Sequence, residues 1–230
     1  MAEAELARFV DRDTMLYERT YPHPIDRVWR AIVEPAEFSV WFIPGRLDLR
    51  VGGRYWFGDD GYQGAVEAIE PPRLLRLRDD KQDLMQYALA AVAGGTRLQF
   101  THHIPPGGPR TELPDPGREP RSFILGGDHP GDPDTPWKPG FVAGYHGMFD
   151  DLADLLDGVA TGSRLPDTEL GHVARWWADY PPPSARDLTP EQRDTIARSM
   201  RLRQRWFELI EVYRDHIAAT IPPADPAQKG

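Results

Sequence analysis

The sequence predicts an α+β fold in which a curved antiparallel sheet surrounds one long C-terminal helix. Three observations predict it. An amphipathic helix occupies residues 141–158, a meander of strands fills 46–104, and one strand with two short helices precedes that meander. Elements in this order favour a single sheet that buries one face against one helix.

The helix at 141–158 has its large apolar residues at the i, i+4, i+7 and i+8 spacing of one helical face. These residues are Phe141, Tyr145, Met148, Phe149, Leu152, Leu155 and Leu156. The opposite face, which we expect to be solvated, carries Asp150, Asp151, Asp154 and Asp157. Gly158 then stands where a left-handed C-terminal cap is expected.

The first two turns of this helix contain little side chain, because Ala143, Gly144 and Gly147 lie there. Glycine inside a helix costs roughly 0.5–1 kcal/mol relative to alanine. We therefore expect a strand, a loop or a ligand to approach this end of the helix closely.

Residues 14–21 alternate and contain β-forming residues, so they are predicted to be the first strand. Two short helices follow over 25–33 and 36–42, the second introduced by Pro35. Glycine pairs and other turn residues then separate six short strands. The six predicted strands are 46–51, 54–57, 62–69, 74–78, 84–92 and 96–104.

The composition excludes several classes of function. The chain of 230 residues has a net charge of −9, which argues against nucleic acid as the main partner. It contains no cysteine, so disulfides and thiol catalysis are excluded. The N-terminus lacks an apolar signal region and no apolar run of 18 residues occurs, so we expect a cytoplasmic protein without a membrane segment.

Two regions extend beyond the predicted sheet and helix. Residues 105–139 hold ten Pro and six Gly, a composition typical of a lid, a binding loop or disorder. We place a domain boundary near 160, giving a 1–160 domain with this insertion and a helical extension over 161–230. In the extension, a helix is expected from Thr189, which begins a capping box, to about residue 217.

The predicted helix at 189–217 has a wide apolar face. Its members are Leu202, Trp206, Leu209, Ile210, Tyr213 and Ile217. A face of this size has to be covered, since a monomer rarely exposes such a patch. We expect it to pack on its own domain, with a protein partner or a homodimer as the alternative.

Five motifs carry a family resemblance over about residues 14–158. They are RTYPHPIDRVWRAIVEPAEFSVWFIP, DLRVGGRYWF, GAVEAIEPPRLLRL, GGTRLQFTH and GYHGMFDDLADLL. In this order the sequence resembles the SRPBCC superfamily, and within it the bacterial homologues of the heat-shock-protein-90 ATPase activator. The resemblance implies a START-like helix-grip fold whose cavity, between sheet and long helix, takes apolar ligands. The loop at 105–139 is longer than in this branch, and 161–230 matches no part of it.

A cavity in this place would be lined by aromatic residues, one histidine and small residues of the long helix. The candidate lining residues are Trp41, Phe42, Tyr55, Phe57, Phe100, His102, Phe141, Gly144, Tyr145 and Met148. Each also has a simpler interpretation as core packing, because aromatic residues at such spacings are usually buried structure. His102 has the same phase as Leu98 and Phe100, so it should face inward, where a histidine more often makes a structural hydrogen bond.

A metal site can be assembled on paper from His102, His103, Asp128, His129 and His146. No two of them have the spacing of metal ligands on a helix. We therefore expect no metal and no cofactor.

Three classes of function remain open. The first is a protein that binds a small apolar or aromatic molecule in the cavity, which the aromatic supply favours. The second is a cyclase- or hydrolase-type enzyme that uses the same cavity, with catalytic residues unknown because no triad converges. The third is a co-chaperone-like module that binds proteins, which rests on the family name alone.

Overall fold

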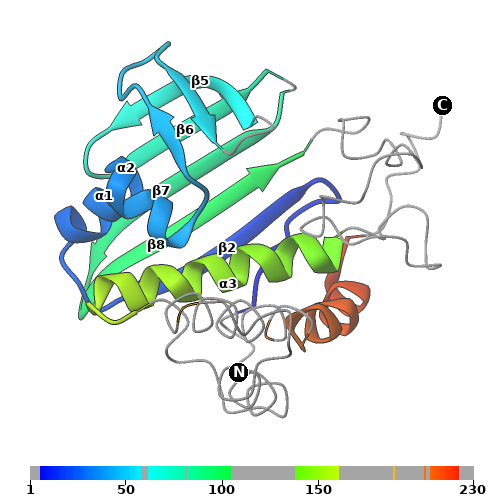
Figure 1. Cartoon of the computed structure of the whole chain (residues 1–230). Helices are drawn as coiled ribbons and strands as arrows, with labels where there is room; N and C mark the ends of the chain where they lie inside the picture. Colours follow the sequence, from blue (N-terminus) through cyan, green and yellow to red (C-terminus); the bar gives the residue numbers. More distant parts are fainter. Residues whose placement is uncertain are drawn as a thin grey trace.

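A computed structural model describes residues 6–57, 62–80, 82–104, 138–160, 189, 205 and 208–222. It confirms the α+β helix-grip fold (Figure 1). The elements are β1 (Arg8–Phe9), β2 (Thr14–Tyr21), α1 (Ile25–Val33), α2 (Pro35–Trp41), β3 (Gly45–Leu47), β4 (Arg54–Phe57), β5 (Tyr62–Glu70), β6 (Leu74–Asp79), β7 (Leu84–Val92), β8 (Gly95–His103) and α3 (Lys138–Leu156). Most of the predicted loop at 105–139, and the expected lid, lie outside the described residues.

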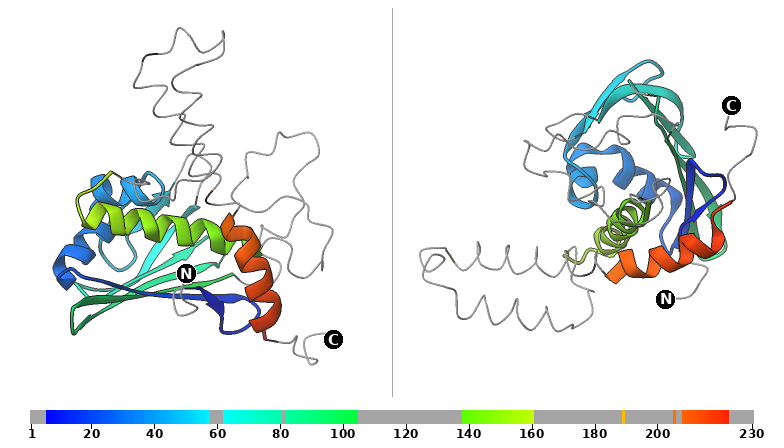
Figure 2. Two further views of the ribbon diagram at one scale, coloured as in Figure 1. Left: turned by 90° about the horizontal axis from the view of Figure 1, so that it is seen from below. Right: turned by 90° about the vertical axis from the view of Figure 1, so that its right-hand side faces the viewer.

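The strands form one antiparallel sheet in the order β1-β2-β8-β7-β6-β5-β4-β3. The meander runs in sequence from β3 to β8, and β2 then joins the free edge of β8. Figure 2 shows that the sheet curves around α3, while α1 and α2 cover the remaining part of its concave side. This topology leaves one concave face, and it is the face that holds the core.

The third strand is shorter than expected, since the strand predicted over 46–51 ends at Leu47. Beyond it the chain turns, and the backbone amide of Gly53 bonds to the carbonyl of Arg50 at 2.7 Å. The Gly52 amide and the Gly53 carbonyl then pair with Val66 of β5. A Cβ at Gly53 would lie 2.1 Å from a backbone carbonyl oxygen, so this turn requires glycine there.

The helix α3 ends as its sequence predicts. Gly158 has φ of +71°, and the amides of Gly158 and Val159 bond to the carbonyls of Leu155 and Asp154 at 3.1 and 3.0 Å. These two bonds form a Schellman cap. At the other glycine-rich turn, a Cβ at Gly147 would meet no atom of the described residues within 4 Å.

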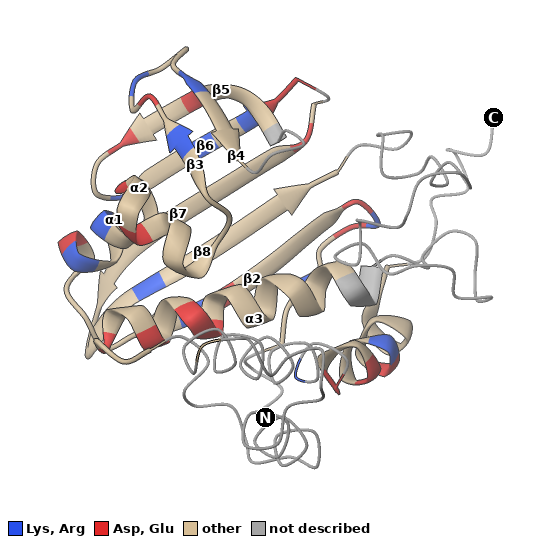
Figure 3. Ribbon diagram, in the orientation of Figure 1, with Lys and Arg blue, Asp and Glu red and all other residues tan. Residues whose placement is uncertain are grey.

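The expectation that all four aspartates of α3 are solvated is wrong for Asp154, which is only 3% exposed. On either side of it, Asp150 pairs with Arg19 at 2.5 Å and Asp157 pairs with His23 at 2.6 Å. Figure 3 shows acidic residues, in red, along the C-terminal half of the α3 ribbon.

The core is one cluster that joins the concave face of the sheet to α1, α2 and α3. The described C-terminal residues 208–220 are helical and contribute to the same cluster. Their buried members are Leu209, Ile210, Tyr213 and Ile217. In Figure 2 this helix crosses next to α3 at the β1–β2 side of the sheet.

No helix in the described part of the chain is both long and apolar enough to cross a membrane.

Candidate functional site

Most of the predicted lining residues meet in one aromatic cluster between the sheet and α3. Tyr145 is its centre, with ring centroids 4.8 Å from Phe100, 4.9 Å from Phe141 and 6.1 Å from Phe42. The ring of His102 also lies against it, at 5.6 Å. These residues come from the C-terminal end of α2, where Phe42 is the cap, and from β8 and α3, so the cluster forms only when the sheet closes on the helix.

The aromatic cluster continues towards the edge of the sheet through Phe57. Its ring contacts Phe42 at 5.8 Å and Tyr55 at 4.9 Å. The ring of Trp41 lies 5.5 Å from that of Phe42, and its indole N–H donates to the Ala31 carbonyl at 2.9 Å. The two remaining candidates are half-buried and sit one helical turn apart; they are Gly144 and Met148.

Inside this aromatic wall lies a small group of polar side chains, which we call the polar centre. It consists of Tyr55, Tyr87, Asp83, His102 and Tyr145. The last four come from β7, the residue just before it, β8 and α3, and each is less than a tenth exposed. Tyr55 reaches the group from β4 and is 2% exposed.

A chain of three polar side chains runs through the polar centre. The Tyr145 hydroxyl lies 2.9 Å from Nδ1 of His102, and Nε2 of His102 lies 3.7 Å from Oδ2 of Asp83. The carboxylate can only accept, so the imidazole proton is placed on Nε2, facing Asp83. Nδ1 is then an acceptor, and the Tyr145 hydroxyl donates to it.

Burial sets the protonation of these groups. It lowers the pKa of His102, against the opposing effect of Asp83, which keeps the imidazole neutral at pH 7. Burial also raises the pKa of Tyr55, and the carboxylates of Asp79 and Asp83 raise it further. The pKa of Tyr87 is raised by burial and then by the neighbouring Tyr145 and Tyr55. All these phenols therefore carry their protons at physiological pH.

Two hydroxyls of the polar centre, those of Tyr55 and Tyr87, have no hydrogen-bond partner among the described residues. Within the same part of the chain, Nε2 of His102 makes no hydrogen bond of ordinary length and faces only the Asp83 carboxylate, at 3.7 Å. A buried polar group left without a partner costs about 1–3 kcal/mol. Few such groups occur in a folded domain, and two of them in one group of side chains mark this part of the core as unusual.

Sequence reasoning missed two members of the polar centre. For Tyr87 a signal was present, because the alternation along β7 places it on the same side as Met85 and Leu89. For Asp83 the sequence contains no such signal, because this residue precedes the strand. It is buried by a turn in which its amide donates to Oδ1 of Asp79 at 2.8 Å.

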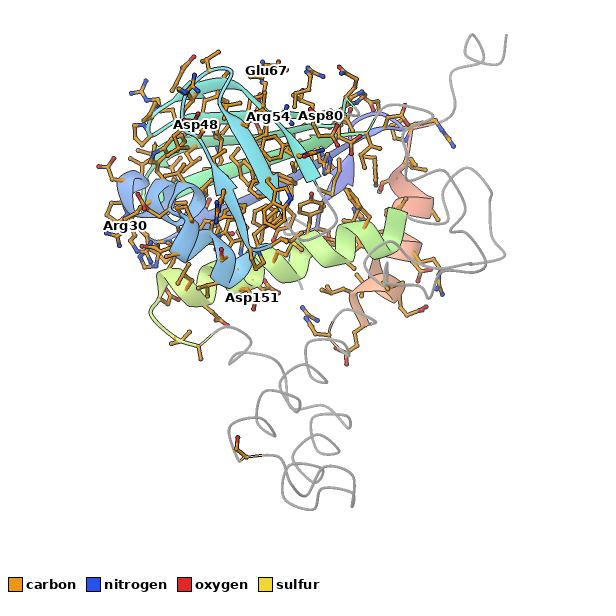
Figure 4. The ribbon with its side chains drawn as sticks, turned by 45° about the horizontal axis from the view of Figure 1, so that its top comes forward. Arg30, Asp48, Arg54, Glu67, Asp80 and Asp151 are labelled. Carbon is orange, nitrogen blue, oxygen red and sulfur yellow. The ribbon has the colours of Figure 1, made fainter. Side chains whose placement is uncertain are left out.

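Several charged residues of β4 to β6 and the following turn form ion pairs on the outer surface of the sheet. Figure 4 shows Arg54, Glu67 and Asp80 on the side of the sheet away from α3. Arg54 and Asp80 form a two-bonded ion pair with both distances at 2.9 Å, and Glu67 pairs with arginines of β6. These pairs are exposed, and each adds little to stability.

A second buried network joins the C-terminal helix to the rest of the fold. Tyr213 receives the Ala7 amide on its hydroxyl at 3.0 Å, and the same hydroxyl lies 2.8 Å from Nδ1 of His146. On its other side, His146 lies 3.8 Å from the carboxylate of Asp150. The network thus connects the N-terminus, α3 and the helix at 208–220.

The histidines considered for a metal site are held apart by these partners. His102 belongs to the polar centre, His146 to the Tyr213 network, and His103 bonds to the Thr14 hydroxyl at 2.9 Å. Asp128 and His129 lie outside the described residues. Within the part of the chain that the structure describes, no three His, Asp or Glu residues are placed to hold a metal ion.

Comparison with known proteins covers part of the predicted 1–160 domain. Residues 22–126 match the family described as Activator of Hsp90 ATPase homolog 1-like protein. No curated protein matches the sequence at a significant level.

Solved structures resemble parts of the chain. CalU16 from Micromonospora echinospora is 26% identical with a TM-score of 0.36, over 42% of this chain and 66% of CalU16, just under two thirds of it. The AHSA1-like protein from Aeromonas hydrophila is 25% identical with a TM-score of 0.36, over 40% of this chain and 74% of its own. MLL2253 from Mesorhizobium loti is 21% identical with a TM-score of 0.46, over 63% and 97%.

Proposed function

We propose that this chain, which carries an AHSA1-like domain of the SRPBCC superfamily, binds a small apolar or aromatic molecule between its sheet and α3. The observation that carries the proposal is the pair of unpartnered hydroxyls in the polar centre, on Tyr55 and Tyr87. A bound molecule that bonds to them removes the cost of leaving them unsatisfied.

The surroundings of the polar centre support the same function. Sites for small molecules are lined mainly by apolar and aromatic side chains, with a few polar groups that fix the orientation of the ligand. Here the rings of Phe42, Phe57, Phe100 and Phe141 supply the apolar wall. The hydroxyl of Tyr55 supplies a polar group at one end of it.

A second candidate function is proton-transfer chemistry of the cyclase or hydrolase type in the same place. The chain from Asp83 through His102 to Tyr145 favours it, because a carboxylate, an imidazole and a phenol in a row can move a proton. A small molecule that co-purifies with the protein distinguishes the two. Recovery of the molecule unchanged after incubation supports binding alone, and its conversion supports the enzyme.

A glycine substitution tests where the ligand binds. Gly144→Leu should weaken the binding of an apolar fluorescent probe, 1-anilinonaphthalene, by about tenfold without unfolding the protein. Gly144 lies one turn before Met148 on α3, and Met148 packs against the core, so a larger side chain there should fill ligand space. Probe fluorescence titrations measure the affinity, and circular dichroism reports the fold.

The matched control is Gly147→Leu on the same helix. A side chain begun there meets no described atom within 4 Å, so this variant should bind the probe as the wild type does. Equal affinities for the wild type and Gly144→Leu would argue against a ligand at this end of α3. Native mass spectrometry of freshly purified protein gives an independent check, since a bound molecule appears as added mass.

A further inference from the structure

The hydroxyl groups of the polar centre differ in whether their protons already have a hydrogen-bond acceptor. Tyr145 uses its proton on Nδ1 of His102, because the other imidazole nitrogen faces the carboxylate of Asp83 at 3.7 Å. The protons of Tyr55 and Tyr87 have no acceptor among the described residues. Burial raises the pKa of both groups, so both remain donors. Two O–H donors are therefore available, and each needs an acceptor.

The charge around the polar centre limits which acceptor is suitable. Asp83 is 2% exposed and Asp79 is 6% exposed, and both carboxylates act on the Tyr55 hydroxyl by raising its pKa. An anionic group bonded to that hydroxyl would stand beside the same carboxylates in a low-dielectric interior. Repulsion between like charges is strong there. A carboxylate, sulfonate or phosphate on the ligand is thus disfavoured.

A cationic ligand fits the two aspartates but not the hydroxyls. Ammonium and guanidinium groups only donate hydrogen bonds, so the protons of Tyr55 and Tyr87 would remain without an acceptor. A neutral carbonyl oxygen has two lone pairs and no charge. It satisfies the donors and tolerates the carboxylates, and unlike a hydroxyl it brings no further proton that needs an acceptor.

We propose that the bound molecule presents a neutral carbonyl oxygen on an apolar or aromatic skeleton to the hydroxyls of Tyr55 and Tyr87. This assignment rests on the proposed binding function and names the chemical class of its ligand. The skeleton packs on the rings of Phe100 and Phe141, and the carbonyl points into the polar centre.

Three naphthalenes that share one skeleton test the assignment. The ketone is 6-propionyl-2-dimethylaminonaphthalene, the comparator without a carbonyl is the parent amine 2-dimethylaminonaphthalene, and the anionic comparator is 6-dimethylaminonaphthalene-2-carboxylate. All three fluoresce, so titration gives each affinity directly. The ketone should bind about tenfold more tightly than the parent amine, which is the effect of roughly one good hydrogen bond. The carboxylate should bind more weakly than either.

Variants then assign the effect to the hydroxyls. Tyr55→Phe and Tyr87→Phe should each reduce ketone affinity by several-fold to tenfold and leave the affinity of the parent amine unchanged. Both should stay folded, because each removes a hydroxyl that has no partner in the free protein. The emission of the bound ketone should also shift to shorter wavelength in the variants, since a hydrogen bond to its carbonyl shifts it to longer wavelength.

The matched control is Tyr21→Phe. The Tyr21 hydroxyl is fully buried but donates to the Phe149 carbonyl at 3.2 Å, outside the polar centre, so its loss should not change ketone affinity. Tighter binding of the carboxylate than of the ketone, or equal effects on the ketone and the parent amine in the tyrosine variants, would overturn the carbonyl assignment while the binding function stands. Failure of all three naphthalenes to bind the wild type would overturn both.

Discussion

Replacing Tyr213 by alanine is expected to lower the free energy of unfolding by about 4 kcal/mol, the usual cost of removing a buried aromatic side chain. The melting temperature should fall by roughly 10 °C for a chain of this length. Tyr213 is 0% exposed and lies in the same core cluster as α3 and the sheet. Its hydroxyl also holds the Ala7 amide and Nδ1 of His146, which would both lose their partner.

The neighbouring residue supplies the control for this substitution. Val212 stands on the same helix but is 40% exposed, so Val212→Ala should change stability by no more than about 0.5 kcal/mol. Urea unfolding of the two variants at pH 7 compares them. If Tyr213→Ala were no more destabilising than Val212→Ala, the helix at 208–220 would not be part of the folded core.

The same experiment addresses the alternative of a homodimer through 189–217. Packing within one chain predicts a midpoint of unfolding that does not depend on protein concentration, and a monomer on dilution. Packing between chains predicts a midpoint that rises with concentration. A dimer of the wild type that becomes a folded monomer in Tyr213→Ala would favour the second arrangement.

The strands and the long helix were predictable because their hydrophobic periodicity is local. The alternation along 84–92 and the cap at Gly158 both appear in the structure as predicted. The strand expected over 46–51 was wrong because alternation continues into a turn. In that turn Leu49 and Val51 are exposed, and Gly53 lies against backbone oxygens. Nothing in the alternation distinguishes such a turn from a strand.

The candidate site was predictable only in part, for a similar reason. Positions such as Phe100, His102 and Tyr145 follow from which face of an element is apolar. The contacts that these residues make cannot be predicted in this way. Tyr145 and His102, for example, are 43 residues apart and meet only where α3 packs on the sheet. The burial of Asp83 and of Asp154 depends on neighbours from distant elements in the same way.

The stability of the fold should depend on pH through His146. This side chain is 2% exposed, and burial lowers its pKa from 6.5 to about 4, with Asp150 opposing the effect and Arg19 and Arg205 adding to it. The folded state therefore holds His146 neutral. The unfolded chain takes up a proton at this histidine once the pH falls below about 6.5.

Since the unfolded state binds more protons between these two values, stability falls as the pH is lowered from about 6.5 to about 4. The contribution of the neutral His146 to the free energy of unfolding is fully present above pH 6.5. One pKa unit corresponds to 1.36 kcal/mol, so this contribution is about 3 kcal/mol, and most of it has been lost at pH 4. His146→Gln removes this titration. We expect the variant to be less stable than the wild type at pH 7, since Tyr213 loses its imidazole partner, and the gap to close as the pH approaches 4. Urea unfolding at pH 7, 6, 5 and 4 measures it. A difference between the two proteins that stays constant over this range would show that His146 is protonated equally in the folded and unfolded chains.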